Sequence, residues 1–128
     1  MWESILEDRR LDVDRAMMKM ALAAARLSNC KKKQNGAIIV IDDFVVAYGF
    51  NFTRKECTVC HREGAKAGYW TDSERCPVIH AEVAAIYNAS RRGISTRGGL
   101  MYCTYFPCVP CARAIGDAGI ESVTYLDE

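Results

Sequence analysis

The chain has almost no excess of charge of either sign and no long hydrophobic run. Its 17 Lys and Arg residues nearly balance 16 Asp and Glu residues, giving a formal net charge of +1. Proteins that bind the nucleic-acid backbone usually have a clear excess of basic over acidic residues, so the absence of such an excess argues against a nucleic-acid partner. No apolar run approaches the roughly 20 residues of a membrane span, and the charged first ten residues do not resemble a signal peptide. We therefore expect a cytoplasmic protein with no membrane partner.

The sequence also lacks the even cysteine count of a secreted disulfide framework. It has seven cysteines and only two histidines, His61 and His80, both of which lie close to cysteines. In a reducing compartment, such clusters more often bind metal or take part in catalysis than form disulfides. The length of 128 residues suits one compact domain, expected to span residues 1–128 and to bury about two thirds of its unfolded surface.

Hydrophobic periodicity predicts a first helix that begins at Asp12 or Asp14 and ends near Ser28. Apolar residues recur along it at helical spacing and are expected to face the core. They are Met17, Met20, Ala21, Ala24 and Leu27.

The rest of the chain predicts alternating strands and helices. Residues 37–41 and 44–50 should form an antiparallel hairpin around Asp42-Asp43. A helix, a strand, a helix and a strand are then expected at 81–92, 100–104, 108–118 and 122–126. Because a helix joins the last two strands, they should be parallel. We predict an α/β fold in which helices cover a single mixed sheet.

Three potential metal ligands stand at the starts of two consecutive predicted helices. His80 begins the first of these helices, and Cys108 and Cys111 begin the second. Cysteines three residues apart share a helix face, and a helix N-terminus favours the thiolate that a metal requires. Three protein ligands leave one tetrahedral position for water, which is typical of catalytic zinc. Glu82 is placed to take a proton from that water and return it to a substrate nitrogen.

The pattern His-x-Glu followed by Pro-Cys-x-x-Cys is the signature of zinc-dependent nucleobase deaminases. Further segments make the chain resemble the deoxycytidylate (dCMP) deaminase branch of the cytidine deaminase-like superfamily. They are residues 36–40, 48–51, 79–86 and 106–112. This resemblance implies a three-layer α/β/α sandwich, a homo-oligomer and a free nucleotide as substrate. It also implies hydrolytic removal of the 4-amino group, converting dCMP to dUMP and ammonia.

Several substrate contacts are implied by the same resemblance. The N–H of Ala81 would bind the pyrimidine 2-oxo group, and Asn51 would hold the sugar or the base edge. Asn51 also suits an ordinary turn after a strand, so both interpretations stay open. Lys33 lies in the Lys31–Lys33 turn, which would approach the nucleotide phosphate unless it is simply solvated. Phe106, directly before the Pro-Cys-x-x-Cys motif, is a further candidate for substrate contact.

Four other cysteines and one histidine border or occupy the irregular segment 51–75. They are Cys30, Cys57, Cys60, His61 and Cys76. Some dCMP deaminases hold a second, structural zinc in these regions, and Cys30 falls where one ligand would be. We expect a second zinc with four ligands from this set, preferably the cysteines, while free thiols are the alternative.

Some positions depart from the family pattern. Phe52-Thr53-Arg54 replaces the usual Gly-x-Pro of the segment that forms the effector site, so regulation by dCTP and dTTP is not implied. Asn35 stands in place of Val and Ala84 in place of Asn, which could alter the accepted nucleotide. The alternatives are a deaminase of single-stranded DNA or tRNA, of free nucleosides or of a non-canonical heterocycle. A zinc-binding module without catalysis is a further alternative.

Overall fold

The computed structural model describes residues 2–54 and 76–127, with side chains described for 9–54 and 76–126. Within these residues, seven elements follow one another in the predicted order. They are α1 (Trp2–Ala25), β1 (Gly36–Ile41), β2 (Phe44–Phe50), α3 (Ala81–Arg91), β3 (Leu100–Tyr105), α4 (Val109–Asp117) and β4 (Ser122–Asp127). No helix in this described part of the chain is both long and apolar enough to cross a membrane.

The four strands form one mixed sheet in the order β2-β1-β3-β4. β1 is antiparallel to β2 and to β3, whereas β3 and β4 are parallel. The predicted hairpin and the predicted parallel pair are therefore confirmed. Asp42 and Asp43 turn the hairpin with φ angles of 52° and 66°, a left-handed pair that matches the twist of the flanking strands.

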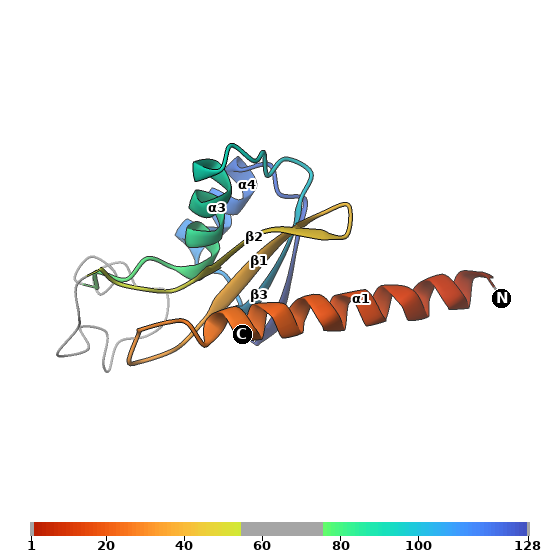
Figure 1. The fold of residues 1–128 in the computed structure, drawn as a ribbon, viewed down its shortest axis with the longest axis horizontal. Coiled ribbons are helices and arrows are strands. Elements are labelled where there is room, and N and C mark those ends of the chain that lie inside the picture. The colour runs from red at the N-terminus through yellow and green to blue at the C-terminus, as the bar shows by residue number, and fades with distance from the viewer. Residues whose placement is uncertain (1, 55–75, 128) are drawn as a thin grey trace.

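Helices cover both faces of this sheet, as Figure 1 shows, with α1 on one face and α3 and α4 on the other. Alternate side chains of β1 and β3 serve the two layers, because successive residues of a strand point to opposite faces. Ile38, Val40 and Tyr102 pack in the core beneath α1. Ala37, Ile39, Met101 and Cys103 pack in the core beneath α3 and α4. The expected α/β/α sandwich is thus confirmed.

The first helix differs from its prediction at both ends. It begins at Trp2 instead of Asp12 or Asp14, and it ends at Ala25 instead of Ser28. No glycine or proline lies between Trp2 and Asp12, so nothing in the sequence interrupts the helix there. Asp14 does not cap the helix but binds the hydroxyl of Tyr102 from its interior.

The buried stripe of α1 was predicted only in part. Met17, Ala21 and Ala24 are buried as expected, but Met20 is 47% exposed and Leu27, beyond the helix end, is 57% exposed. Met18 and Ala25 are buried in addition. The sheet covers a face of the helix that is centred closer to Met18 and Ala25 than the sequence indicated.

Two contacts bring the end of β2 against the start of α3. Gly49 has no side chain, and a Cβ there would overlap main-chain atoms of Ala81 and Ala85. Phe52 and Ile79 then form an isolated antiparallel bridge, in which the N–H of Ile79 donates to the carbonyl of Phe52 at 2.7 Å and the reverse bond measures 3.1 Å. The bridge fixes the chain directly before His80.

Candidate active site

The starts of α3 and α4 place the three predicted ligands together. His80 is the N-cap residue of α3, and Cys108 is the N-cap residue of α4, both with extended backbone. Cys111 follows in the first turn of α4, behind Pro110. Proline suits this position because the first N–H groups of a helix have no acceptor within the helix. Both helices lie on the same face of the sheet (Figure 1), and the proximity of His80 to the two cysteines shows that their N-termini meet.

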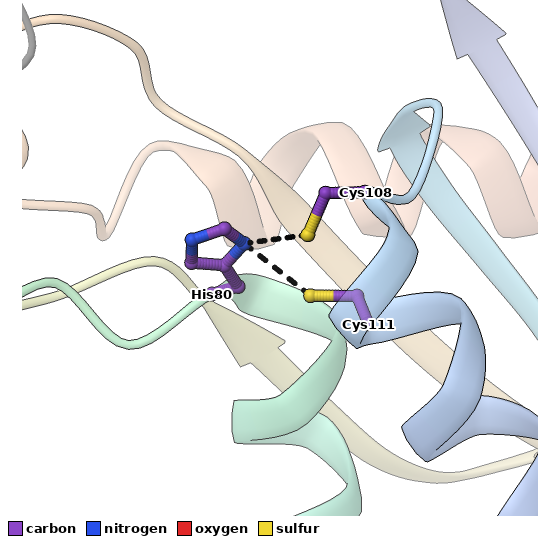
Figure 2. A group of neighbouring side chains, drawn as sticks. All are labelled: His80, Cys108 and Cys111. Carbon is purple, nitrogen blue, oxygen red and sulfur yellow. Dashed lines mark hydrogen bonds between the residues drawn. The ribbon is translucent and has the colours of Figure 1, made fainter. Parts of the chain in front are cut away.

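The imidazole of His80 points at the two sulfur atoms, as Figure 2 shows. Its Nδ1 lies 3.4 Å from Cys108 Sγ and 3.3 Å from Cys111 Sγ. All three ligand atoms lie within 4.8 Å of one another. Neighbouring N and S ligands of tetrahedral zinc lie about 3.5 Å apart, given Zn–S and Zn–N bonds near 2.3 and 2.0 Å. The donor set and its spacing therefore fit zinc.

The two thiols shift each other's pKa values in opposite directions. The pKa of Cys108 is lowered to about 4, chiefly because the Cys111 thiol donates a hydrogen bond to it and also because His80 lies beside it. The pKa of Cys111 is raised, first by that same hydrogen bond and then by burial. A thiolate already held beside an imidazole is a suitable starting point for binding a divalent cation.

Glu82 lies next to this group with its side chain only 5% exposed. Burial raises its pKa, while a hydrogen bond with Cys111 and the proximity of His80 act in the opposite direction. A buried carboxyl group that takes up a proton more readily than usual suits a group that must accept a proton and release it.

The structure gives Asn51 a clear partner on the main chain. Its side chain is 6% exposed, its Nδ2 donates to the carbonyl of Lys33 at 2.7 Å, and its Oδ1 accepts from the N–H of Asn35 at 2.8 Å. Asn51 therefore holds the turn before β1 with its side chain, a role that the sequence did not indicate, and its contact with the sugar or the base edge stays a prediction. Ala81, the first residue of α3, is buried, and its N–H has no acceptor within the helix.

The two other substrate candidates each contact an aromatic ring. The Nζ of Lys33 lies 3.0 Å from the centroid of the Tyr105 ring. Phe106 is 51% exposed, and its ring meets that of Tyr125 edge to face at 5.0 Å. The sequence did not indicate Tyr105, since no local pattern links it to a lysine that lies far from it along the chain.

The positions that depart from the family pattern have structural partners too. Asn35 accepts a hydrogen bond from the Thr104 hydroxyl at 3.4 Å, and Ala84 is buried in α3. Thr53 is held by Asn29, whose side chain accepts from the Thr53 N–H at 2.9 Å and donates to its carbonyl at 2.8 Å. The Asn29–Thr53 bonds fasten the chain after α1 to the segment after β2, and the Asn35–Thr104 bond fastens the turn before β1 to β3.

The predicted second metal site falls mainly outside the described residues. Cys30 and Cys76 are half-buried free thiols, whereas Cys57, Cys60 and His61 lie in the segment that the structure does not describe. The second zinc therefore stays a prediction. The remaining thiol, Cys103, is fully buried in β3, and burial raises its pKa to about 12, so it behaves as a small apolar side chain.

Comparison with known proteins agrees with this site. The family described as "Cytidine and deoxycytidylate deaminase zinc-binding region" matches residues 11–127. A deoxycytidylate deaminase of Mycobacterium phage D29 is 34% identical over 127 residues, covering 93% of this chain and 98% of the phage protein. The deoxycytidylate deaminase of Schizosaccharomyces pombe is 32% identical over 117 residues, covering 88% of this chain.

A solved structure shares the fold. The dCMP deaminase of cyanophage S-TIM5, crystallised with dCMP and dUMP, superposes with a TM-score of 0.74 at 30% identity. The match covers 91% of this chain and 82% of the cyanophage chain. The chain spans only 36% of the length of the S. pombe protein, so that enzyme has much that this chain does not match.

Proposed function

The chain belongs to the family of cytidine and deoxycytidylate deaminase zinc-binding regions, and on that basis we propose that it hydrolyses dCMP to dUMP and ammonia. One observation carries the proposal. His80, Cys108 and Cys111 converge at two helix N-termini beside the buried carboxyl group of Glu82. The phage D29 and cyanophage relatives, which match most of the chain, bear the name of this activity.

In this proposal, His80, Cys108 and Cys111 would hold one catalytic zinc. Zinc in such a site would lower the pKa of a bound water molecule, so that a hydroxide able to attack C4 of cytosine forms near neutral pH. Glu82 would take a proton from the nucleophile, deliver it to N3 and later protonate the departing amine. The raised pKa of Glu82 supports this role, because the same group must first accept each proton and then give it up.

The base and sugar-phosphate contacts are proposed from the residues around this group. The N–H of Ala81, which has no acceptor within α3, would donate to the 2-oxo group of the pyrimidine. Lys33 would face the 5′-phosphate, Phe106 would line the approach to the site, and Asn51 would keep the turn before β1 in place or reach the sugar.

We propose further that the protein is a cytoplasmic homo-oligomer. Large apolar side chains on and just after α1 are more than 40% exposed in the single chain, which suits a surface covered by another copy. They are Leu11, Met20, Leu22 and Leu27. A thiolate site and free cysteines suit a reducing compartment. A second zinc at Cys30 and Cys76, with ligands from the segment between residues 55 and 75, would complete the expected metal content.

The decisive experiment replaces Glu82 by Gln in the full chain. We expect Glu82→Gln to keep its catalytic zinc, measured by elemental analysis, and to lose at least about 100-fold in kcat for ammonia release from dCMP. Glu121→Gln, which removes an exposed carboxylate, is the matched control and should retain wild-type activity. Wild-type turnover by Glu82→Gln would show that the proton carrier is misassigned, and wild-type protein inactive on dCMP would refute the proposed reaction.

A further inference from the structure

The segment Cys108-Val109-Pro110-Cys111 has a chemical capacity that zinc binding does not use. It places two thiols three positions apart at the start of α4, with a proline directly before the second. α4 connects the parallel strands β3 and β4, so the motif lies at the strand-to-helix junction of a βαβ unit. A Cys-x-x-Cys motif in this setting is typical of proteins that form and break a disulfide between the two cysteines.

The two sulfur atoms lie close enough for such a reaction. Together with Nδ1 of His80 they lie within 4.8 Å of one another, and the Cys111 thiol donates a hydrogen bond to Cys108. Cys108 is the N-cap residue, with extended backbone angles of φ −68° and ψ 167°. Side-chain rotation and a small adjustment of this residue, which lies outside the helical backbone, can bring the sulfurs to the S–S bonding distance of about 2.0 Å.

The two thiols differ in their access to solvent. Cys108 is half-buried, whereas Cys111 is only 2% exposed. Val109, which follows Cys108 directly, is 57% exposed, so the motif begins at the surface of the molecule. An oxidant in solution therefore meets Cys108 first, and Cys111 lies behind it as a second thiol. Cysteines that respond to oxidants typically combine an accessible sulfur with such a neighbour.

We propose that Cys108 and Cys111 are a site of reversible oxidation, at which hydrogen peroxide converts the two thiols into a disulfide that cannot hold zinc. The effect on the metal rests on the proposed zinc site, whereas the disulfide requires only the two thiols. Because a cysteine binds zinc as the thiolate, the disulfide would leave His80 as the only one of the three proposed ligands. Oxidation would thus switch off the metal centre without removing any residue from it.

The reaction has two steps. In the first, the Cys108 sulfur attacks one peroxide oxygen and the O–O bond breaks, which leaves a sulfenic acid on Cys108 and releases hydroxide, protonated to water. In the second, the Cys111 sulfur attacks the Cys108 sulfur, the S–O bond breaks and a second water leaves. Two thiols and one peroxide thus give one disulfide and two waters, as the two electrons lost by the sulfurs reduce the peroxide. A dithiol reductant reverses the oxidation by thiol–disulfide exchange.

The test treats the zinc-loaded full chain with hydrogen peroxide. Peptide mapping by mass spectrometry identifies the disulfide, and a chromophoric chelator measures released zinc. We expect zinc from this site to leave in step with the formation of the Cys108–Cys111 disulfide, and dithiothreitol with added zinc to restore both thiols and the metal. Cys103, the fully buried thiol of β3, is the internal control and should stay reduced.

Two matched variants test the order of the steps. Cys111→Ser removes the second thiol, so a sulfenic acid should accumulate on Cys108, where dimedone captures about tenfold more of it than in the wild type. Cys108→Ser leaves only the buried sulfur, and its dimedone labelling at Cys111 should stay about tenfold below that of Cys108 in the other variant. Equal labelling of the two sulfurs, or a Cys108 paired with a different cysteine, would overturn the proposal.

A metal-depleted sample keeps this inference separate from the proposed function. It should form the same disulfide about tenfold faster than the zinc-loaded chain, because no metal occupies the sulfurs. Circular dichroism shows whether this sample is folded, and the zinc-loaded chain decides the matter alone if it is not. Zinc that leaves without a Cys108–Cys111 disulfide would refute the inference. A chain that forms the disulfide but releases no ammonia from dCMP would refute only the proposed reaction.

Discussion

The side chain of Tyr102 connects the sheet to the first helix by hydrogen bonds. Tyr102 on β3 is 1% exposed, and its hydroxyl donates to Asp14 of α1. Arg10 donates to the same hydroxyl at 3.4 Å and forms an ion pair with Asp14 at 3.3 Å. Burial raises the pKa of Tyr102 to about 12, and the hydrogen bond to the Asp14 carboxylate adds to the effect. The folded protein therefore keeps the Tyr102 proton at pH values where an unfolded tyrosine has lost it.

This shift predicts a loss of stability at alkaline pH. The unfolded chain releases the Tyr102 proton near pH 10 and the folded chain near 12, so stability is fully present below pH 10 and falls as pH rises through that interval. We expect the loss attributable to Tyr102 to be about 2 kcal/mol. Urea unfolding of the wild type and of Tyr102→Phe at pH 8 to 12 measures it by difference. Parallel stability curves for the two proteins would contradict the prediction.

Among single residues, those of the proposed zinc group were the easiest to predict. His80, Cys108 and Cys111 stand in short motifs at helix starts, and helix geometry alone brings the two cysteines to one face. The contact between Lys33 and Tyr105 could not be predicted in this way. It depends on which strands become neighbours in the sheet, and no motif in the sequence encodes that choice.

At the scale of elements, the packing of β2 on α3 depends on one glycine. A Cβ on Gly49 would overlap the backbone of Ala81 and Ala85, and backbone atoms of a helix cannot move aside independently. Gly116 in α4 is the opposite case, because a Cβ there would meet nothing within 4 Å. The two positions therefore form a matched pair.

We expect Gly49→Ala to lower the free energy of unfolding by about 3 kcal/mol, since helix and strand must move apart. Gly116→Ala should raise it by up to about 1 kcal/mol, because alanine loses less backbone freedom in a helix than glycine does. Denaturant unfolding of both variants checks this. Similar effects of the same sign at the two sites would show that the close approach does not determine the packing.

Hydrophobic periodicity predicts which elements form but not always which face of an element is buried. The order of elements and their types were predicted well, since strands and helices alternate with clear turn residues between them. The buried face of α1 was not predicted well, because apolar residues occur around much of the circumference of this helix. Met18 is buried and Met20 is exposed, and only the position of the sheet decides between them.

For the whole molecule, the proposed zinc would link the starts of α3 and α4, two helices that β3 separates along the chain. His80 belongs to the start of α3, and the two cysteines belong to the start of α4. A ligand that binds only the folded chain stabilises it in proportion to the logarithm of its concentration over Kd. Metal should therefore contribute to the stability of the entire domain.

Removal of zinc is expected to lower the unfolding temperature by roughly 15 °C, which corresponds to about 4 kcal/mol for a well-saturated site. Calorimetry before and after treatment with a chelator measures the change, and added zinc but not magnesium should reverse it. Cys108→Ser should start from the lower temperature. A chelated wild type that unfolds at the original temperature would show that the metal does not hold α3 and α4 together.

The overall architecture was predictable, but the neighbours within the sheet were not. The hairpin and the parallel pair follow from the lengths of their connections. The pairing of β1 with β3 does not, since either β1 or β2 could have taken the central place. That choice decides what surrounds the metal ligands, because it puts the turn before β1 beside Tyr105 and Thr104.

The bridge between Phe52 and Ile79 has a consequence for engineering and for evolution. Two hydrogen bonds hold Phe52 and Ile79 side by side, so the spacing of these two points is set by the pair itself. Sequences of quite different length can be exchanged at such a junction while strand register and the imidazole keep their places.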